Sequence, residues 1–149
     1  MTRQIQSVKV RAAGKNDAEA VARLAGELGY PSTVAQIRER LDLIDGDPQH
    51  ATFVAVAGGG AVVGWIQLSR MCSLVTDPRA EITGLIVDSM HRGDGVGRLL
   101  VDRGEAWARE QRLAAMGVRS NVVREGAHRF YVRLGYAITK SQNVFRNDL

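Results

Sequence analysis

The chain has 149 residues, of which 45% are hydrophobic and 24% are charged, and its 20 Lys and Arg against 16 Asp and Glu give a net charge of +4. This length predicts a single globular domain over residues 1–149, and this composition excludes a disordered or fibrous protein. A single cysteine, Cys72, excludes an internal disulfide or a thiolate cluster.

The first half of the chain predicts a strand, two helices and a hairpin. Residues 5–12 alternate loosely, as in a strand. Asp17 stands at an N-cap position before a helical stripe that stops at Gly29, and Ser32 or Thr33 can cap a second helix that runs to about Asp45. Residues 52–57 and 61–68 are rich in β-formers, and the three glycines between them predict a hairpin turn.

The second half alternates strands and helices. Residues 80–88 form a near-continuous apolar run that is typical of a central strand buried on both faces, and residues 96–112 carry an amphipathic helical pattern. A strand over 116–123, a short helix over 127–134 that stops at Gly135, and a closing strand or hairpin over 136–145 complete the prediction. The element order is βααβββαβαβ, which is an α/β fold class.

No segment predicts a membrane protein or an exported one. The first 14 residues lack the apolar core of a signal peptide, and the longest apolar stretch, around residues 62–66, is far too short to span a bilayer. We therefore expect a cytoplasmic protein without a membrane partner. The positive charge is uneven, because residues 1–91 carry a net charge of −1 and residues 92–149 carry +5. This distribution favours an anionic ligand on the second half.

The junction after Val87 carries the strongest chemical signal. A buried strand runs into Arg92-Gly-Asp-Gly-Val-Gly97, and a helix follows directly. Glycines allow the backbone to approach a ligand closely, and a helix start presents free N–H groups to an anion, so this junction can hold a pyrophosphate. The spacing does not match the dinucleotide-binding fingerprint, and the loop lacks the Gly-Lys-Ser/Thr of a nucleoside-triphosphate loop.

The loop instead resembles the R/Q-x-x-G-x-G/A signature of the GNAT acetyltransferase superfamily, through Arg92, Gly95 and Gly97. A second landmark, A-x-x-F-Y-x-x-L-G-Y over residues 127–136, resembles a helix that follows the signature in that family by about thirty residues. The predicted element order also matches. The resemblance implies a single-domain acyl-CoA N-acyltransferase fold, with a mixed, mostly antiparallel sheet and helices on both faces.

The resemblance implies that acetyl-CoA is the cosubstrate. The glycine loop would hold its pyrophosphate by main-chain N–H groups, and the preceding strand would pair its backbone with the pantetheine arm. The N–H of Val87 would stabilise the oxyanion of the reaction. The side chains of the strand are also typical of core packing. The expected cofactor-binding residues are Leu85, Ile86, Val87, Arg92, Gly93, Asp94, Gly95, Val96, Gly97, Arg98, Asn121 and Arg124. Arg124 stands where many members carry an asparagine.

The resemblance also implies the acid and the base. Tyr131 matches the residue that protonates the departing thiolate, although an aromatic on this helical stripe is also typical of a core. Glu81 begins the central strand where several members place the carboxylate that deprotonates the amine, and a solvated carboxylate at a strand end would look the same. Tyr30 lies in a loop that lines the acceptor site in members of the family. The three histidines have no metal-ligand spacing, so no metal is expected.

The sequence therefore predicts an acetyl-CoA-dependent N-acetyltransferase that acetylates a primary amine, of a small molecule, by direct attack in a ternary complex. Two alternatives stay open, a non-catalytic acyl-CoA sensor or interaction domain on the same fold and an acetyltransferase acting on a protein amine. Few aromatic residues and no continuous basic run argue against a nucleic-acid partner. A homodimer is an expectation from the family alone.

Overall fold

The computed structural model describes residues 7–119 and 125–149, in two compact units, Met1–Arg119 and Ser120–Leu149. The first unit holds a five-stranded sheet in the order β1-β2-β3-β4-β5. Neighbouring strands are antiparallel except β4 and β5, which are parallel, so the predicted mixed and mostly antiparallel sheet is confirmed. The strands are β1 (Lys9–Ala12), β2 (His50–Val56), β3 (Val62–Met71), β4 (Arg79–Val87) and β5 (Met116–Val118).

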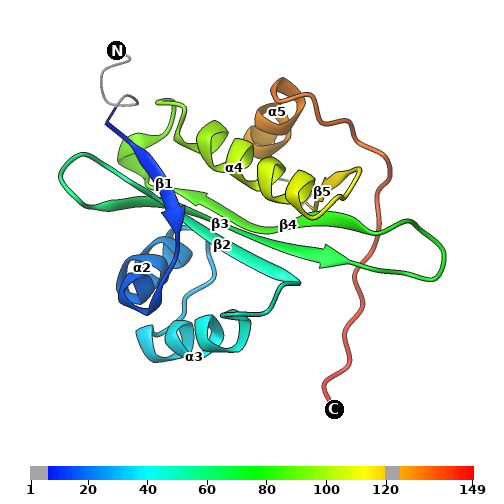
Figure 1. Cartoon of the computed structure of the whole chain (residues 1–149), viewed down its shortest axis with the longest axis horizontal. Coiled ribbons are helices and arrows are strands. Elements are labelled where there is room, and N and C mark those ends of the chain that lie inside the picture. Colours follow the sequence, from blue (N-terminus) through cyan, green and yellow to red (C-terminus); the bar gives the residue numbers. More distant parts are fainter. Residues whose placement is uncertain (1–6, 120–124) are drawn as a thin grey trace. The chain divides into compact units, whose positions relative to one another are not determined.

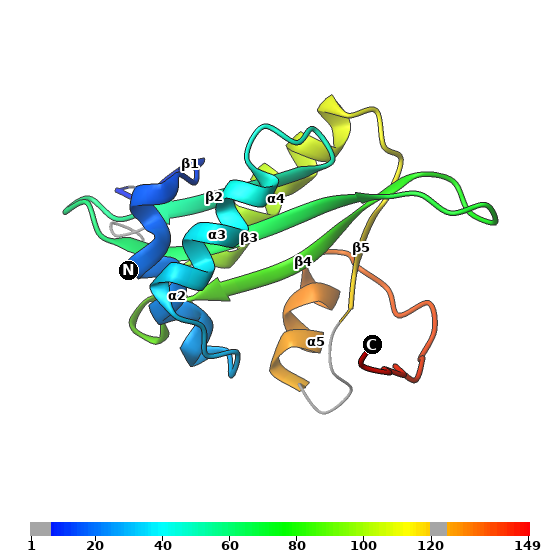
Figure 2. The ribbon, with the colours of Figure 1, turned by 90° about the horizontal axis from the view of Figure 1, so that it is seen from below.

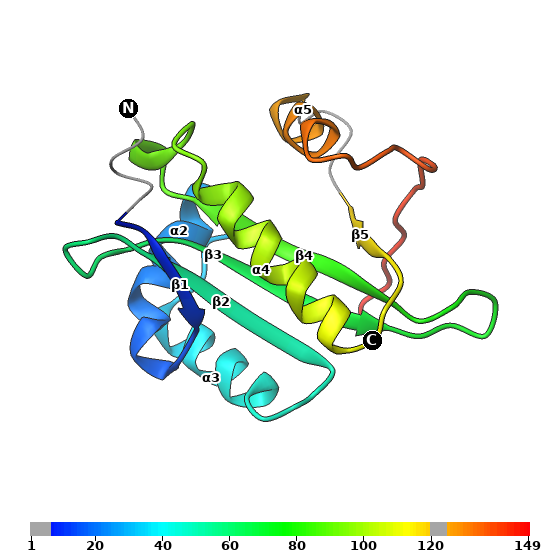
Figure 3. The same cartoon turned by 45° about the horizontal axis from the view of Figure 1, so that its top comes forward.

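Helices cover both faces of this sheet. In Figure 1, α2 (Ala18–Glu27) and α3 (Val34–Ile44) lie on one face, and α4 (Val96–Glu110) lies on the other. Figure 3 shows α4 running along the strands. Two short 3₁₀ turns, η1 (Lys15–Asp17) and η2 (Ser89–His91), precede α2 and α4. No helix among the described residues is long and apolar enough to cross a membrane.

The core has a layer on each side of the sheet. On the first face, seen from below in Figure 2, α2 and α3 pack against the sheet, and Leu24 and Ile37 belong to one buried cluster with Val54 of β2. On the second face α4 approaches β3 so closely at Gly104 that an added Cβ would lie 2.8 Å from a methyl carbon of Leu68. These layers hold β3 and β4 firmly at the centre of the sheet.

Two local signals that the sequence predicts, a helix cap and a hairpin turn, are present in the structure. Thr33 caps α3 by accepting a hydrogen bond from the N–H of Gln36, and the Gln36 side chain reciprocates. This capping box fixes the predicted start of the second helix. The glycine turn between β2 and β3 forms the predicted hairpin, closed by a bond from the N–H of Ala57 to the carbonyl of Ala61.

Asp17 is the N-cap residue of α2 as predicted, but its side chain makes no capping hydrogen bond, and its carboxylate instead ties β1 to the start of α2. Both of its oxygens accept hydrogen bonds from the Arg11 guanidinium at 2.9 Å, and the N–H of Gly14 donates to Oδ2 at 2.8 Å. The Asp17 side chain is only 7% exposed. The Arg11 bonds, followed by the Gly14 N–H, hold the pKa of Asp17 below its usual range.

Replacing Asp17 with Asn should lower the free energy of unfolding by about 1.5–3 kcal/mol, the usual contribution of a hydrogen bond to a charged group. Because the folded pKa lies below the unfolded one, this stabilisation is present above about pH 4 and is lost as the pH falls through the folded pKa. Urea denaturation of both proteins at pH 7 and pH 3 measures it. Asp42→Asn, which breaks an exposed pair with Lys15, is the control and should cost under about 1 kcal/mol. Equal effects of the two substitutions would contradict the role of Asp17.

The second unit contains α5 (Glu125–Arg133). The helix ends at Gly135, whose φ of 93° is left-handed, and the N–H of Tyr136 bonds to the carbonyl of Tyr131. The predicted helix and its stop are therefore confirmed. The predicted closing strand is wrong, because residues 136–149 form no strand in the structure. The observed order matches the predicted one from β1 to α5. The assignment of residues 1–149 to one domain stays a prediction.

Candidate functional site

One edge of β4 is open over its second half. The whole strand pairs with β3, but β5 pairs only with Ala80, Glu81 and Ile82. Beyond Ile82, no strand of the described residues pairs with β4 on that side. Within residues 7–119 and 125–149, the backbone groups on this side have no neighbouring strand, and an extended ligand could add to the sheet there as a strand does.

The pairing pattern tells which groups face the open edge. The N–H of Asp88 bonds to the carbonyl of Val63 at 2.8 Å, and Val87 lies opposite Gly64. Antiparallel ladders alternate, so the backbone groups of Leu85 and Val87 point away from β3 and those of Ile86 point toward it. Of the three predicted strand residues, Leu85 and Val87 thus direct their main-chain groups to the open edge, where the carbonyl of Val87 accepts a hydrogen bond from Nε of Arg92. Ile86 is a core residue, with 4% exposure.

A β-bulge lies at the point where the pairing with β5 ends. Gln67 of β3 is opposite Gly84 and Leu68 is opposite Ile82, so Thr83 is an extra residue in β4. A bulge bends its strand and increases the local twist. The Trp65 ring covers Gly84 so closely that an added Cβ would lie 2.6 Å from the ring. The bulge at Thr83 comes directly after Ile82, the last residue of β4 that pairs with β5.

The glycine loop follows β4 directly and leads into α4. Gly93 and Gly95 both have a φ of 85°, which is the left-handed region that other residues rarely adopt. Gly95 is the N-cap of α4, and the first-turn N–H groups of Val96, Gly97 and Arg98 have no acceptor within the helix. These donors and the positive end of the helix dipole form an anion-binding site. The loop therefore has the backbone geometry expected of an anion site, and its binding of a pyrophosphate stays a prediction.

Charged side chains surround this loop. Arg92 and Arg98 are exposed, and Nε of Arg92 donates to the carbonyl of Val87 at 3.2 Å, which ties the loop to the last residue of β4. Asp94, half-buried between the two glycines, is an acidic residue in the same loop. Binding of an anion there has to rely on main-chain N–H groups and on the arginines, because the Asp94 carboxylate repels an anion.

Glu81 lies on β4 at the level of the last pairs with β5. Its side chain is 8% exposed, and Oε1 accepts an ion-pair contact from Nε of Arg119 at 2.8 Å. Gly117 lies opposite Glu81 on β5, and Arg119 follows two residues later, directly after the strand. Glu81 is therefore a buried and paired carboxylate. The alternative of a solvated carboxylate at a strand end is wrong.

A row of polar side chains continues from Glu81 across the sheet. Ser69 of β3 is opposite Glu81, and His50 of β2 is opposite Ser69. Nδ1 of His50 lies 2.9 Å from Oγ of Ser69, and both Ser69 and Glu81 are buried. The sequence analysis missed Ser69, His50 and Arg119, because only the strand register brings them to one level.

Tyr131 belongs to α5 in the second unit and is described with it. Its ring makes edge contacts with Phe130 and Tyr136, at centroid distances of 5.1 and 5.8 Å. Burial raises the pKa of Tyr131 to about 12, so its phenol is protonated at neutral pH. The aromatic packing and a capacity to donate a proton are both present in this one residue.

The structure says less about the remaining predicted site residues. Tyr30, in the loop after α2, is 65% exposed. Asn121 and Arg124 lie outside the described residues. Cys72 is exposed, and the described residues contain no group of three or more side chains suited to a metal.

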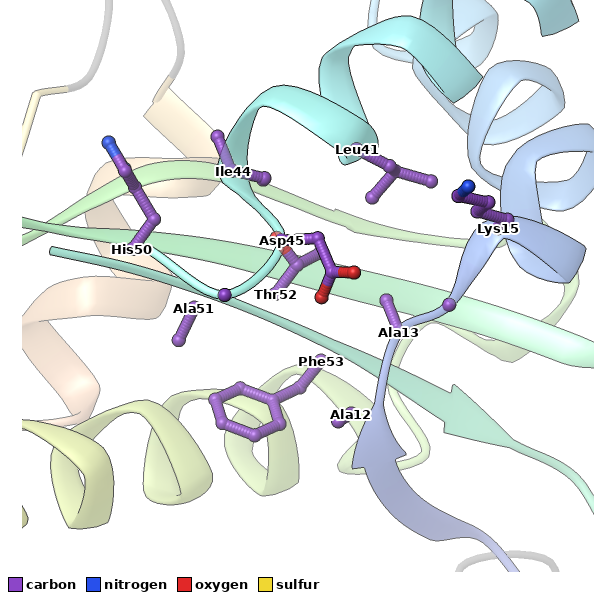
Figure 4. Close-up of a pocket in the computed structure, with 12 residues that line it drawn as sticks. Ala12, Ala13, Lys15, Leu41, Ile44, Asp45, His50, Ala51, Thr52 and Phe53 are labelled. Carbon is purple, nitrogen blue, oxygen red and sulfur yellow. The ribbon is translucent and has the colours of Figure 1, made fainter. Parts of the chain in front are cut away.

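A cavity of about 200 Å³ lies away from this loop, between the end of β1, the end of α3 and the start of β2. Figure 4 shows its lining, in which Asp45 and Thr52 are next to a mostly apolar wall and His50 stands at one side. Neither β4 nor the glycine loop lines it. We therefore place the candidate site at the open edge of β4 and not in this cavity.

Comparisons with known proteins find relatives over almost the whole chain. A protein of *Stenotrophomonas maltophilia* named aminoglycoside N(6')-acetyltransferase type 1 is 28% identical over 144 residues, covering 94% of this chain and 93% of its own length. A transcriptional regulator from *Bacillus halodurans* C-125 matches with a TM-score of 0.83 and 25% identity, over 94% of this chain and 99% of that one. Aminoglycoside N-acetyltransferase AAC(6')-Iy in complex with CoA matches with a TM-score of 0.84 and 18% identity, over 95% of both chains.

The model of the acetyltransferase (GNAT) family matches residues 19–136. This range contains all of α2 except its first residue, and also α3, the open edge of β4, the glycine loop and α5. The chain belongs to the GNAT family of acetyltransferases and is an acetyl-CoA-dependent N-acetyltransferase.

Proposed function

We propose that the protein acetylates a primary amine of a small molecule by direct attack within a ternary complex. One observation carries the proposal, namely that the open edge of β4 runs directly into the glycine loop and the N-terminus of α4. This arrangement offers a continuous main-chain surface that ends in an anion site. It suits an extended ligand with a phosphate at one end, as CoA is.

The residues present fit this cosubstrate. The main-chain N–H groups of the loop, from Gly93 to Arg98, would bind the pyrophosphate, with support from the Arg92 and Arg98 side chains. Leu85 and Val87 would bond to the pantetheine arm through their backbone. An N–H on the same edge, such as that of Val87, would stabilise negative charge on the acetyl oxygen. Acetyl-CoA supplies an activated acyl group as a thioester.

The acid and base roles fall to Tyr131 and Glu81. The amine nitrogen attacks the acetyl carbonyl carbon, the C–S bond breaks, Glu81 accepts the amine proton and the Tyr131 O–H gives a proton to sulfur. The Glu81 carboxylate is buried, and its contact with Arg119 at 2.8 Å holds it in place on β4. The raised pKa of Tyr131 keeps its proton available.

An aminoglycoside is the acceptor that we propose to test first. The relative from *Stenotrophomonas maltophilia* and the CoA-bound structure are both named for acetylation of aminoglycosides. An aminoglycoside carries several ammonium groups on a polar scaffold. Cytoplasmic location, a homodimer and the absence of nucleic-acid or membrane partners stay predictions.

Release of CoA with a panel of amines tests the proposal. The panel contains aminoglycosides, a polyamine, free amino acids and a peptide with a free N-terminus. We expect CoA release above the rate of acetyl-CoA hydrolysis with at least one small-molecule amine. Transfer to the peptide alone would overturn the small-molecule assignment.

A second candidate is an acyl-CoA-binding regulator on the same fold. The similarity to a protein named as a transcriptional regulator favours it. Such a protein needs the phosphate loop and no acid or base. Saturable binding of CoA by calorimetry, with no transfer to any amine of the panel, would support this second function and overturn the first.

A further inference from the structure

Arg23 of α2 joins the ends of two strands beside the glycine loop. Its Nη2 donates to the carbonyl of Val62, at the start of β3, at 3.2 Å. Its Nη1 donates to Oδ2 of Asp88, directly after β4, at 3.3 Å. The planar guanidinium suits such a bridge, because its donors point in fixed directions toward two acceptors at once.

Asp88 in turn sets the direction in which the chain leaves β4. Its Oδ1 accepts a hydrogen bond from the N–H of Met90 at 3.0 Å, which caps the turn η2. Its own N–H bonds to the carbonyl of Val63. The Met90 bond, followed by the Arg23 contact, holds the pKa of Asp88 below its usual range. Each carboxylate oxygen therefore has a definite partner.

A second contact links the same helix to the same turn. Glu27 lies one turn of α2 after Arg23, and the Ser89 hydroxyl donates to its Oε1 at 3.4 Å. Arg23 and Glu27 are four residues apart, so they share one face of α2. The face of α2 that carries both residues therefore holds the turn from which the glycine loop begins.

We propose that Arg23 is a positioning residue for the cosubstrate: acting through Asp88, it holds the turn at residues 88–91 so that the glycine loop presents its N–H groups to the pyrophosphate. This inference rests on the proposed role of the loop. A loop that is held in its binding conformation loses less freedom on binding. Arg23 therefore strengthens acetyl-CoA binding and takes no part in the acyl transfer.

The expected signature is a loss of affinity at constant turnover. Arg23→Gln removes the ion pair and leaves the cap at Met90, and Asp88→Asn does the same, because asparagine also caps well. In each variant the Kd for CoA and the KM for acetyl-CoA should rise on the order of five-fold, the size expected for a contact of this kind. The kcat should stay within about two-fold of the unchanged protein, because no group that contacts the reacting atoms is altered.

The double variant decides whether the two residues act as one unit. If Arg23 acts through Asp88, the double variant should bind CoA no more weakly than the weaker single variant. Arg38→Gln, which removes the same charge from an exposed position on α3, is the matched control and should leave the Kd unchanged. Urea denaturation of each variant confirms that it is folded. Calorimetry with CoA and steady-state kinetics on the full chain give all the quantities.

Three results would overturn the inference. An unchanged Kd in Arg23→Gln would remove any role in binding, additive losses in the double variant would mean that Arg23 does not act through Asp88, and a fall in kcat would place it in the chemistry. If the unaltered protein does not bind CoA, the proposed function fails as well. If the unaltered protein binds CoA and Arg23→Gln binds it equally well, only this inference fails.

Discussion

Tyr131→Phe should lower kcat by about 100-fold while the KM for acetyl-CoA changes by less than about two-fold. Loss of a general acid typically costs 10²- to 10⁴-fold, and the substitution removes only the hydroxyl. The phenylalanine ring can keep the edge contacts with Phe130 and Tyr136, so the packing of the second unit is preserved. Steady-state kinetics with saturating acceptor measure both constants.

Tyr136→Phe is the matched control, because it removes a hydroxyl from the neighbouring ring of the same unit. We expect it to retain kcat. The pKa of about 12 for Tyr131 adds a second readout, because the phenol stays protonated up to about pH 10. The kcat of the unchanged protein should therefore show no decline below that pH that depends on Tyr131. Equal kcat values for Tyr131→Phe and the unchanged protein would remove the proton-donor role.

The parts of the fold that sequence could predict are those set by neighbouring residues. Thr33 and Gln36 are three positions apart, and their reciprocal bonds form as the first turn of α3 forms. Gly93, Gly95 and Gly135 each stand at a left-handed position that a local pattern requires. The anion site at the start of α4 follows from the same kind of local signal, so the sequence predicts it without any knowledge of tertiary contacts.

The parts that sequence could not predict depend on partners far along the chain. Residues 136–145 contain β-formers such as Tyr136, Ile138 and Val144, but a strand also needs a partner that hydrogen-bonds to it. These residues form no ladder in the structure. The extra residue at Thr83 is likewise invisible locally, because a bulge exists only relative to the register with β3.

The surroundings of Glu81, the candidate base, also depend on residues far along the chain. Its position at the start of a strand was predicted, but its burial and its pairing with Arg119 were not. That pair joins β4 to the residue after β5, and the two residues are 38 positions apart in the sequence. The polar row through Ser69 and His50 also requires the correct register of three strands. Local sequence patterns therefore predicted where Glu81 lies, and the strand register determines which residues surround it.

The surroundings of Glu81 lead to the second large effect. Glu81→Gln should lower kcat by about 100-fold at pH 7, because the amide cannot accept the proton of the acceptor amine. The fold should tolerate the change, since glutamine keeps the size and one oxygen near Arg119, and the 65% exposed guanidinium remains hydrated. Urea denaturation provides the check on folding, and Glu39→Gln, an exposed position on α3, is the control for the lost charge.

The pH dependence separates a base from a residue that only supports the sheet. An alkyl amine has a pKa of about 10.4, so at higher pH more of the acceptor is already neutral and needs no base. The deficit of Glu81→Gln relative to the unchanged protein should therefore shrink steadily between pH 7 and pH 10. A deficit of constant size across this range would mean that Glu81 acts through structure alone. In that case water, without a carboxylate, would receive the proton at the end of the open edge of β4.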